Sequence, residues 1–316
     1  MSSNEKACSR RSFLTSAALA SAGLIFTNTN DWANAFNQKK PNSKFAGVQI
    51  GAITYSFRSM PEKNIADILK YIVASGVSAV ELMGDAVEAY AGKPQKADKA
   101  AVAAWRAHVS MDKFKEVRKM FDKAGVSIYA FKQPDALAMN STDAEIDYLM
   151  RAAKVLGAKS VTLELPKKAE HTARLGSFGT KHKMFVGYHT HLQATDQVWD
   201  VALSQSPYNS INLDCGHYIA AGGANTRASL LALIEAKHDR ITSFHMKDRK
   251  SKQNGGDNLP WGAGDTPIKE ILLLLKQKKY DIPVSVELEY KVPEGSDAVK
   301  EVKKCVGFAK NILLPG

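Results

Sequence analysis

The alternation of apolar and polar residues along the chain predicts a repeated strand–helix unit. Short, largely apolar runs typical of buried strands precede stretches with apolar residues at helical spacing, as in 61–75. Gly76, Gly125 and Gly157 each follow such a stretch, and glycine readily takes the left-handed conformation that closes a helix. The predicted strands are Val48–Tyr55, Val77–Leu82, Val126–Phe131, Ser160–Leu165, Met184–His191, Ile211–Cys215, Ile241–Met246 and Pro283–Tyr290.

Eight strands separated mostly by helical patterns predict a single-domain α/β protein, a (β/α)₈ barrel (TIM barrel) over residues 48–316. Thr142 and Glu145 form a capping-box pattern at the start of the helix after the third strand. The segment Pro166–Lys183 is the weakest predicted helix, because its apolar face is poor and glycine or proline interrupts it. The long stretch Gly84–His108 is expected to carry an extra lid helix.

The first 35 residues have the features of an export signal. Arg10 and Arg11 precede the short apolar run Ala17–Phe26, and Ala33–Ala35 has small residues at the spacing of a cleavage site. This order resembles a bacterial twin-arginine signal peptide, which implies export to the periplasm, with residues 36–47 as a linker to the barrel. The alternative is a basic N-terminal helix with a chance arginine pair. No apolar run reaches the roughly 18 residues that span a bilayer, so we expect no stable membrane anchor.

Composition narrows the classes of function. The 316 residues are 45% hydrophobic and 24% charged, and 21 glycines with 11 prolines are too few for a collagenous or disordered chain. Cys8, Cys215 and Cys305 can form neither a disulfide framework nor a thiolate zinc site. The net charge of +11 is compatible with nucleic acid or an anionic ligand and demonstrates neither.

Polar residues gather on one face of five predicted strands, although strands of a parallel sheet that are covered on both sides are usually apolar throughout. These faces carry Ser160, Thr162 and Glu164; Gly187, His189 and His191; Asn212 and Asp214; Ser243 and His245; and Ser285, Glu287 and Glu289. If the apolar faces meet the helices, the polar faces point into the barrel. The ionisable residues then lie near the carboxyl ends of the strands, where barrel active sites form.

Two glutamates, an aspartate and a histidine that converge inside a barrel need a compensating positive charge. A bound divalent cation is the simplest source, and three oxygen donors with one nitrogen donor suit Mn²⁺, Mg²⁺, Co²⁺ or Zn²⁺. The alternative is an internal salt-bridge network that uses Lys247 and Arg249.

Five strand motifs occur in order: VTLELP at the fourth strand, VGYHTH at the fifth, NLDCGHY at the sixth, SFHMKDR at the seventh and PVSVELEY at the eighth. Together with WGAGD in the loop before the seventh helix, they resemble the sugar phosphate isomerase/epimerase family of xylose isomerase-like barrels, from Val48 to the C-terminus. The resemblance implies a metal ion held by Glu164, Asp214, His245 and Glu287, with Glu289 as the competitor for the last position.

The resemblance also implies roles in catalysis. In ketose epimerases of this family the two metal-bound glutamates, here Glu164 and Glu287, accept and donate a proton on opposite faces of the substrate, through an enediolate. The expected substrate-binding residues are His189, His217, Arg249 and Glu81, and for Glu81 a salt-bridged structural role is the alternative.

These observations predict a divalent-metal-dependent sugar isomerase or epimerase in the periplasm. The motif HTH departs from the His-Asn-His of many relatives, and export makes a sugar phosphate a poor substrate, so a non-phosphorylated sugar or keto-sugar is expected. The alternatives are a keto-glycoside lyase or hydratase using the same site, a non-catalytic carbohydrate-binding barrel, and an apurinic-site endonuclease with Lys247, Arg249, Lys250 and Lys252 beside the mouth. We expect a small carbohydrate as partner and no nucleic acid; the sequence leaves open whether the chain forms a homo-oligomer.

Overall fold

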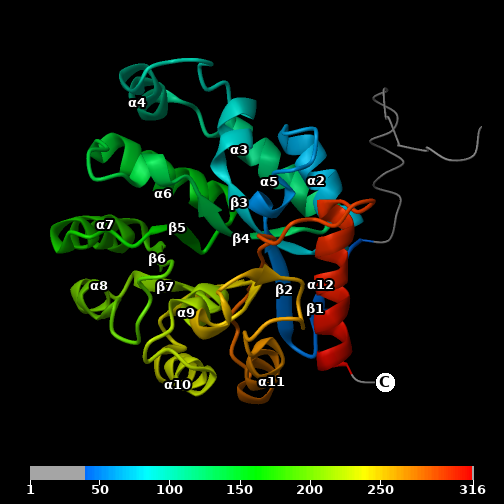
Figure 1. Ribbon diagram of the computed structural model, residues 1–316. Coiled ribbons are helices and arrows are strands. Elements are labelled where there is room, and N and C mark those ends of the chain that lie inside the picture. Colours follow the sequence, from blue (N-terminus) through cyan, green and yellow to red (C-terminus); the bar gives the residue numbers. More distant parts are fainter. Residues whose placement is uncertain (1–39, 315–316) are drawn as a thin grey trace, which may run out of the picture. The chain divides into compact units, whose positions relative to one another are not determined.

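The computed structural model describes residues 40–314, which form a closed barrel of parallel strands surrounded by helices (Figure 1). The barrel strands are β2 (Val48–Ile53), β3 (Ala79–Met83), β4 (Ser127–Lys132), β5 (Ser160–Glu164), β6 (Phe185–His189), β7 (Asn209–Asp214), β8 (Ile241–Met246) and β11 (Val284–Val286). Each pairs in parallel with its neighbours in this order, and β11 pairs with β2 to close the ring. The predicted (β/α)₈ barrel is confirmed.

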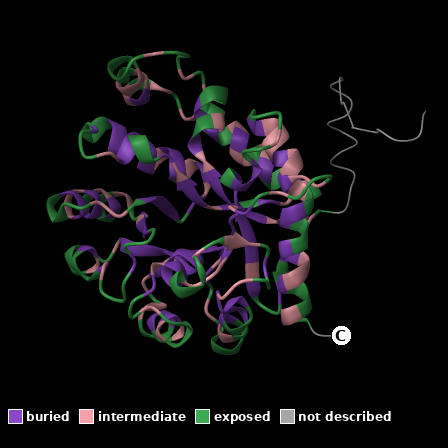
Figure 2. Cartoon of the chain, viewed as in Figure 1, coloured by how far each residue is buried: buried purple, intermediate pink, exposed green. Residues whose placement is uncertain are grey.

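The helices cover the outside of the barrel, and their exposed residues lie mainly on the faces that point away from the strands (Figure 2). They are α2 (Ile65–Ala74), α3 (Gly84–Tyr90), α4 (Lys99–His108), α5 (Asp112–Ala124), α6 (Asp143–Leu156), α7 (Ala169–His182), α8 (Asp200–Gln205), α9 (Cys215–Ala221), α10 (Arg227–Lys237), α11 (Ile268–Lys278) and α12 (Ala298–Leu313), with short 3-10 helices at Thr54–Phe57, Pro134–Leu137 and Lys252–Asn254. Within residues 40–314, every helix falls short of the length and apolar character that a membrane span needs.

The predicted helix ends are present. The Glu145 amide donates to Thr142 Oγ1 at 3.2 Å and the Thr142 amide donates to Glu145 Oε2 at 2.9 Å, which completes the capping box of α6. Gly125 and Gly157 close α5 and α6 with φ angles of 74° and 85°.

Part of the segment predicted as a linker belongs to the folded unit. Lys44–Phe45 form strand β1, which pairs antiparallel with β2, and the side chain of Ser43 is buried. The folded unit therefore includes residues before Val48. The predicted signal peptide, residues 1–35, lies outside the described residues.

The weakest predicted helix is a regular one in the structure. α7 runs over 14 residues although its sequence has a poor apolar face. Two of its glycines explain this, because a Cβ on Gly176 would lie 2.7 Å from Ser206 Cβ and a Cβ on Gly179 would lie 2.8 Å from the Met184 carbonyl oxygen. The helix thus packs by close approach of its backbone rather than by large apolar side chains.

The last barrel strand, β11, is shorter than predicted because the side chain of Ser56 takes the place of strand β2 as its hydrogen-bond partner. β2 ends at Ile53 and turns into a 3-10 helix, whose Ser56 hydroxyl donates to the Val286 carbonyl at 3.0 Å and accepts from the Leu288 amide at 3.0 Å. Residues 287–290 therefore continue past the strand without a regular ladder.

The stretch predicted to carry an extra helix contains α3 and α4, and a buried arginine attaches α4 to the barrel. Arg106 Nε and Nη2 lie 2.9 and 3.1 Å from the two carboxylate oxygens of Glu88, and Nη2 lies 2.8 Å from Asp135. Arg106 and Glu88 are both buried. Lys93 also pairs with Glu88, at 2.8 Å.

Replacing Arg106 with methionine is expected to lower the free energy of unfolding by about 3 kcal/mol, because Glu88 loses its main buried partner and keeps only Lys93 as a cation. Urea unfolding measures this change. Arg151→Met removes a surface pair with Asp147 and should change stability by less than about 1 kcal/mol. Equal effects of the two substitutions would show that the Arg106 network does not hold residues 84–108 in place.

Candidate metal centre at the mouth of the barrel

Three of the predicted ligands meet at the carboxyl ends of adjacent strands. Asp214 ends β7, His245 lies one residue before the end of β8, and Glu287 directly follows β11. All three are buried. His245 Nδ1 lies 3.0 Å from Glu287 Oε2. The inward polar faces predicted from the strand alternation thus bring these three residues into one group.

The buried Lys247 completes this group. Its ammonium nitrogen lies 3.0 Å from Asp214 Oδ2, 2.8 Å from Glu287 Oε2 and 2.8 Å from Glu289 Oε2. The salt-bridge network that was the alternative interpretation of the sequence is therefore present for Lys247. Both glutamates reach the ammonium, but only Glu287 also contacts His245 within the group. The choice of Glu287 over Glu289 as metal ligand stays a prediction.

Arg249, the other cation of the alternative salt-bridge network, contacts a histidine instead of the buried carboxylates. Its Nη1 is 2.6 Å from His217 Nδ1, and its Nε donates to the Gly256 carbonyl at 2.9 Å. Arg249 and His217 are thus side by side at the mouth, and their predicted roles in substrate binding stay predictions.

Behind the group, Glu81 holds His245 in place. Glu81 Oε2 lies 2.8 Å from His245 Nε2, and Thr162 Oγ1 donates to Glu81 Oε1 at 2.6 Å. Carboxylates in this position orient metal-binding histidines and leave the other ring nitrogen for the metal. Glu81 has no exposed surface. Glu81 is thus paired with His245 in the structure, and its predicted contact with substrate stays a prediction.

His189 is oriented in a similar way. Its Nδ1 lies 2.9 Å from Asn212 Oδ1, and Asn212 in turn donates to Ser243 Oγ at 2.7 Å. The other nitrogen, Nε2, faces the group and lies 3.8 Å from Asp214 Oδ2. Burial, together with the charges of His245 and Lys132, lowers the pKa of His189 well below its usual range, so its ring is neutral.

Glu164 lies apart from the buried group. It ends β5 with 47% of its side chain exposed, and its carboxylate is 3.7 Å from Lys132 Nζ and 3.4 Å from His191 Nδ1. β5 is four strands from β11 in either direction around the ring, so Glu164 and Glu287 stand on opposite sides of the mouth. Its role as the fourth ligand stays a prediction.

His217 follows Asp214 at the start of α9, and the two are tied together. The backbone amide of His217 donates to Asp214 Oδ1 at 2.7 Å, so Asp214 caps the helix with one oxygen and faces the group with the other. Lys247 Nζ is 3.1 Å from His217 Nε2. Burial and the charge of Lys247 lower the pKa of His217 to about 3, which keeps the ring neutral.

The charges inside the group influence one another strongly. Burial alone would lower the pKa of His245, but the carboxylates of Glu287 and Glu81 raise it to about 10, so its ring is cationic here. Burial alone would raise the pKa of Glu287, but His245 and Lys247 lower it well below its usual range. For Asp214 burial dominates and raises the pKa.

The group fits a divalent cation. Asp214 Oδ2, His245 Nδ1 and Glu287 Oε2 are buried atoms without a hydrogen bond of good geometry, although ion-pair contacts reach each of them. These are the ligand atoms of three predicted metal ligands. His189, Asp214 and His245 also each offer a ligand atom within 4.8 Å of one another. Two or three carboxylate oxygens with an imidazole nitrogen suit the divalent cations predicted from the sequence.

The sequence interpretation assigned no site role to His191. His189, His191 and His217 offer ring nitrogens within 4.8 Å of one another, and His191 is the exposed member. The signal was available, because His191 is two residues after His189 and shares its face of the predicted strand.

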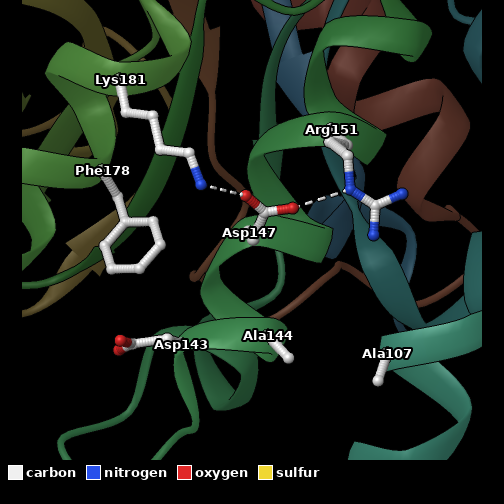
Figure 3. Close-up of a pocket in the computed structure, with 7 residues that line it drawn as sticks. All are labelled: Ala107, Asp143, Ala144, Asp147, Arg151, Phe178 and Lys181. Atoms are coloured by element: carbon white, nitrogen blue, oxygen red, sulfur yellow. Dashed lines mark hydrogen bonds and ion pairs between the residues drawn. The ribbon is translucent and has the colours of Figure 1, made fainter.

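A cavity of about 340 Å³ on the outside of the barrel is separate from this centre (Figure 3). There Asp147 points between Lys181 of α7, at 2.8 Å, and Arg151 of α6, at 2.9 Å. Ion pairs of this exposed kind contribute little to stability.

Comparison with known proteins places the fold in a family. A family model described as Xylose isomerase-like TIM barrel matches residues 69–306, and the chain belongs to this family. No curated protein matches the sequence.

Solved structures share the fold at low sequence identity. The probable 3-DHS dehydratase AsbF from Bacillus anthracis is 16% identical with a TM-score of 0.63, over 84% of this chain and 99% of that one. A sugar phosphate isomerase/epimerase from Parabacteroides distasonis is 17% identical with a TM-score of 0.59, over 84% and 97%. A D-psicose 3-epimerase from Clostridium cellulolyticum, solved with D-tagatose, is 12% identical with a TM-score of 0.60, over 84% and 99%.

Proposed function

We propose that the protein is a divalent-metal-dependent sugar isomerase or epimerase, which removes a proton from the carbon next to a carbonyl and returns it. The observation that carries this proposal is the buried group of Asp214, His245 and Glu287, with Glu164 on the opposite side of the mouth. Carboxylate oxygens and an imidazole nitrogen are a suitable donor set for a divalent cation, and barrel enzymes carry out their chemistry at this end of the strands.

Asp214, His245 and Glu287 would hold the cation, and Glu164 would complete the set by turning inward from its exposed position. The bound cation, Mn²⁺, Mg²⁺, Co²⁺ or Zn²⁺, supplies positive charge against the carbonyl oxygen as the neighbouring carbon loses its proton. Glu81 keeps His245 oriented throughout.

The two glutamates would move the proton. Because β5 and β11 are opposite one another in the barrel, a sugar bound between Glu164 and Glu287 presents one face to each carboxylate. One glutamate then takes the proton, and the other, protonated beforehand, donates its own proton to the opposite face, which inverts the carbon. Between turnovers Glu164 would turn back to its exposed position, where it can exchange its proton with solvent.

Substrate contacts would come from the neutral rings of His189 and His217 and from Arg249. Neutral imidazoles and a guanidinium are suited to sugar hydroxyl and carbonyl oxygens. A non-phosphorylated sugar or keto-sugar fits the export signal predicted for residues 1–35. Elimination or hydration of a keto-glycoside would begin with the same proton removal. The similar structures support this alternative reaction, because they include a probable dehydratase as well as a sugar epimerase.

The proposal is tested by incubating the Mn²⁺-loaded protein with free, oxidised and glycosidic sugars in deuterium oxide and following each by NMR. We expect deuterium at a carbon next to the carbonyl. An epimer or isomer would identify the proposed reaction, whereas loss or addition of a group at the neighbouring carbon would identify a lyase or hydratase. Binding without exchange would indicate a non-catalytic carbohydrate-binding barrel.

Export by the twin-arginine route is part of the proposal. Changing both Arg10 and Arg11 to lysine is expected to leave unprocessed protein in the cytoplasm, since this route depends on the arginine pair. Cell fractionation with mass determination of the N-terminus measures this. Uncleaved protein as the normal mature form would contradict it.

A further inference from the structure

We propose that Lys247 is a built-in cation of the metal centre, and that a divalent cation binds only when the Lys247 ammonium leaves Asp214 and Glu287. This inference rests on the proposed metal centre, but it concerns how that centre is filled. Lys247 would then set the affinity for metal and stabilise the protein when no metal is bound.

The ammonium contacts the oxygens that a metal ion would need. Lys247 Nζ lies 3.0 Å from Asp214 Oδ2 and 2.8 Å from Glu287 Oε2, and these are two of the buried atoms without a good hydrogen bond. A metal ion binds carboxylate oxygens at about 2.0–2.2 Å, so the oxygens must converge on it. A divalent cation bound to these same two oxygens would lie next to the ammonium, and the two charges would repel each other strongly. The two positive charges are therefore alternatives for the same pair of oxygens.

Lys247 also contacts His217, a ring that it shares with Arg249. Lys247 Nζ is 3.1 Å from His217 Nε2, and Arg249 Nη1 is 2.6 Å from His217 Nδ1. An imidazole ring that carries a proton has at most one acceptor nitrogen, so it cannot accept from both cations. One of the two cations must therefore face an N–H group of the ring.

The route of the lysine stem and a place for it to move are both present. A Cβ on Gly216 would lie 2.4 Å from Lys247 Cγ, so only glycine at this position lets the stem enter the centre along this path. Glu289 reaches the same ammonium at 2.8 Å and is 24% exposed. By moving toward Glu289 at the mouth, Lys247 would keep one carboxylate partner as it releases the other two.

The inference is tested with Lys247→Met. Without metal this variant should unfold at a lower temperature than the wild type, because Asp214, Glu287 and Glu289 lose their shared cation. Its dissociation constant for Mn²⁺, measured by isothermal titration calorimetry, should fall at least about tenfold, because no ammonium has to be displaced. Lys252→Met, which removes one charge from the following exposed loop, is the matched control and should change neither quantity.

The outcomes separate this inference from the function on which it rests. Equal or weaker Mn²⁺ binding by Lys247→Met, beside clear binding by the wild type, would overturn the role of Lys247 and leave the metal centre intact. Absence of binding by both proteins would overturn the metal centre and with it the competition. Binding by the variant alone would support the inference in its strongest form.

A second variant and a measurement on the wild type cover the case in which Lys247→Met does not fold. Lys247→Gln keeps a hydrogen-bond donor for the carboxylates without the charge, and it should also bind Mn²⁺ more tightly. In the wild type, reductive methylation followed by mass spectrometry should label Lys247 slowly without metal, where it is 2% exposed, and faster with Mn²⁺. Labelling that is unchanged or slower with Mn²⁺, while Lys252 stays constant, would show that the ammonium does not move.

Discussion

Replacing Glu287 with glutamine is expected to lower kcat by about 10²–10⁴-fold, the usual contribution of a general acid–base residue, while the substrate still binds. Glutamine keeps an oxygen that can reach the cation but cannot take up the proton. Glu164→Gln should cause a loss of similar size from the opposite side of the mouth.

The two variants should differ in the proton exchange that each still catalyses. In a reversible epimerisation, one of them should still exchange the substrate proton with solvent without inverting the carbon, and the other should not exchange at all. Steady-state kinetics with NMR of the products in deuterium oxide measures both properties. Glu170→Gln, which changes an exposed glutamate paired with Lys168, is the control and should leave turnover unchanged. Near-normal turnover in both Glu164→Gln and Glu287→Gln would mean that these carboxylates are structural.

Asp214→Asn is expected to weaken metal binding by more than about 100-fold. Removing a residue that only hydrogen-bonds to a metal ligand weakens binding by up to about 100-fold, and Asp214 is proposed to be a ligand itself. Asparagine lacks the charge but can still accept the hydrogen bond from the His217 amide, so α9 keeps its cap and the barrel should remain folded. Metal content after dialysis against Mn²⁺, with circular dichroism as the test of folding, measures the effect. Asp200→Asn, at an exposed pair with Lys237, is the control.

Full metal occupancy in a folded Asp214→Asn protein would contradict the ligand assignment. Loss of metal from Asp200→Asn as well would show that the effect is general rather than local to the centre.

Most of the fold could be predicted because each strand has its own local signal. The eight strands and the capping box of Thr142 and Glu145 depend on patterns within a few residues, and all are present. The early end of β11 could not be predicted, since it depends on Ser56, far away in the sequence. The regularity of α7 was equally hidden, because Gly176 and Gly179 stabilise it through backbone approach, which a search for apolar side chains does not detect.

The candidate site was predictable to the extent that strand alternation determines it. Asp214, His245 and Glu287 meet because inward-facing positions at the ends of adjacent strands must be close. Lys247 follows His245 by two residues and lies on the same face of the strand, so its inward position could be predicted from the same pattern. Which carboxylates the Lys247 ammonium contacts depends on side-chain conformation, and the pattern does not determine that. The same holds for Glu164, which lies at the rim of the mouth and turns toward His191.

The most direct test of the central claim is the rate at which solvent deuterium enters a bound keto-sugar next to its carbonyl. The metal-loaded wild type should incorporate deuterium at that carbon, and incorporation should stop when the metal is removed and return when Mn²⁺ is added back. If the metal-loaded wild type binds the sugar without incorporating deuterium, or incorporates it equally well without metal, the proposed metal-dependent proton transfer between Glu164 and Glu287 is wrong.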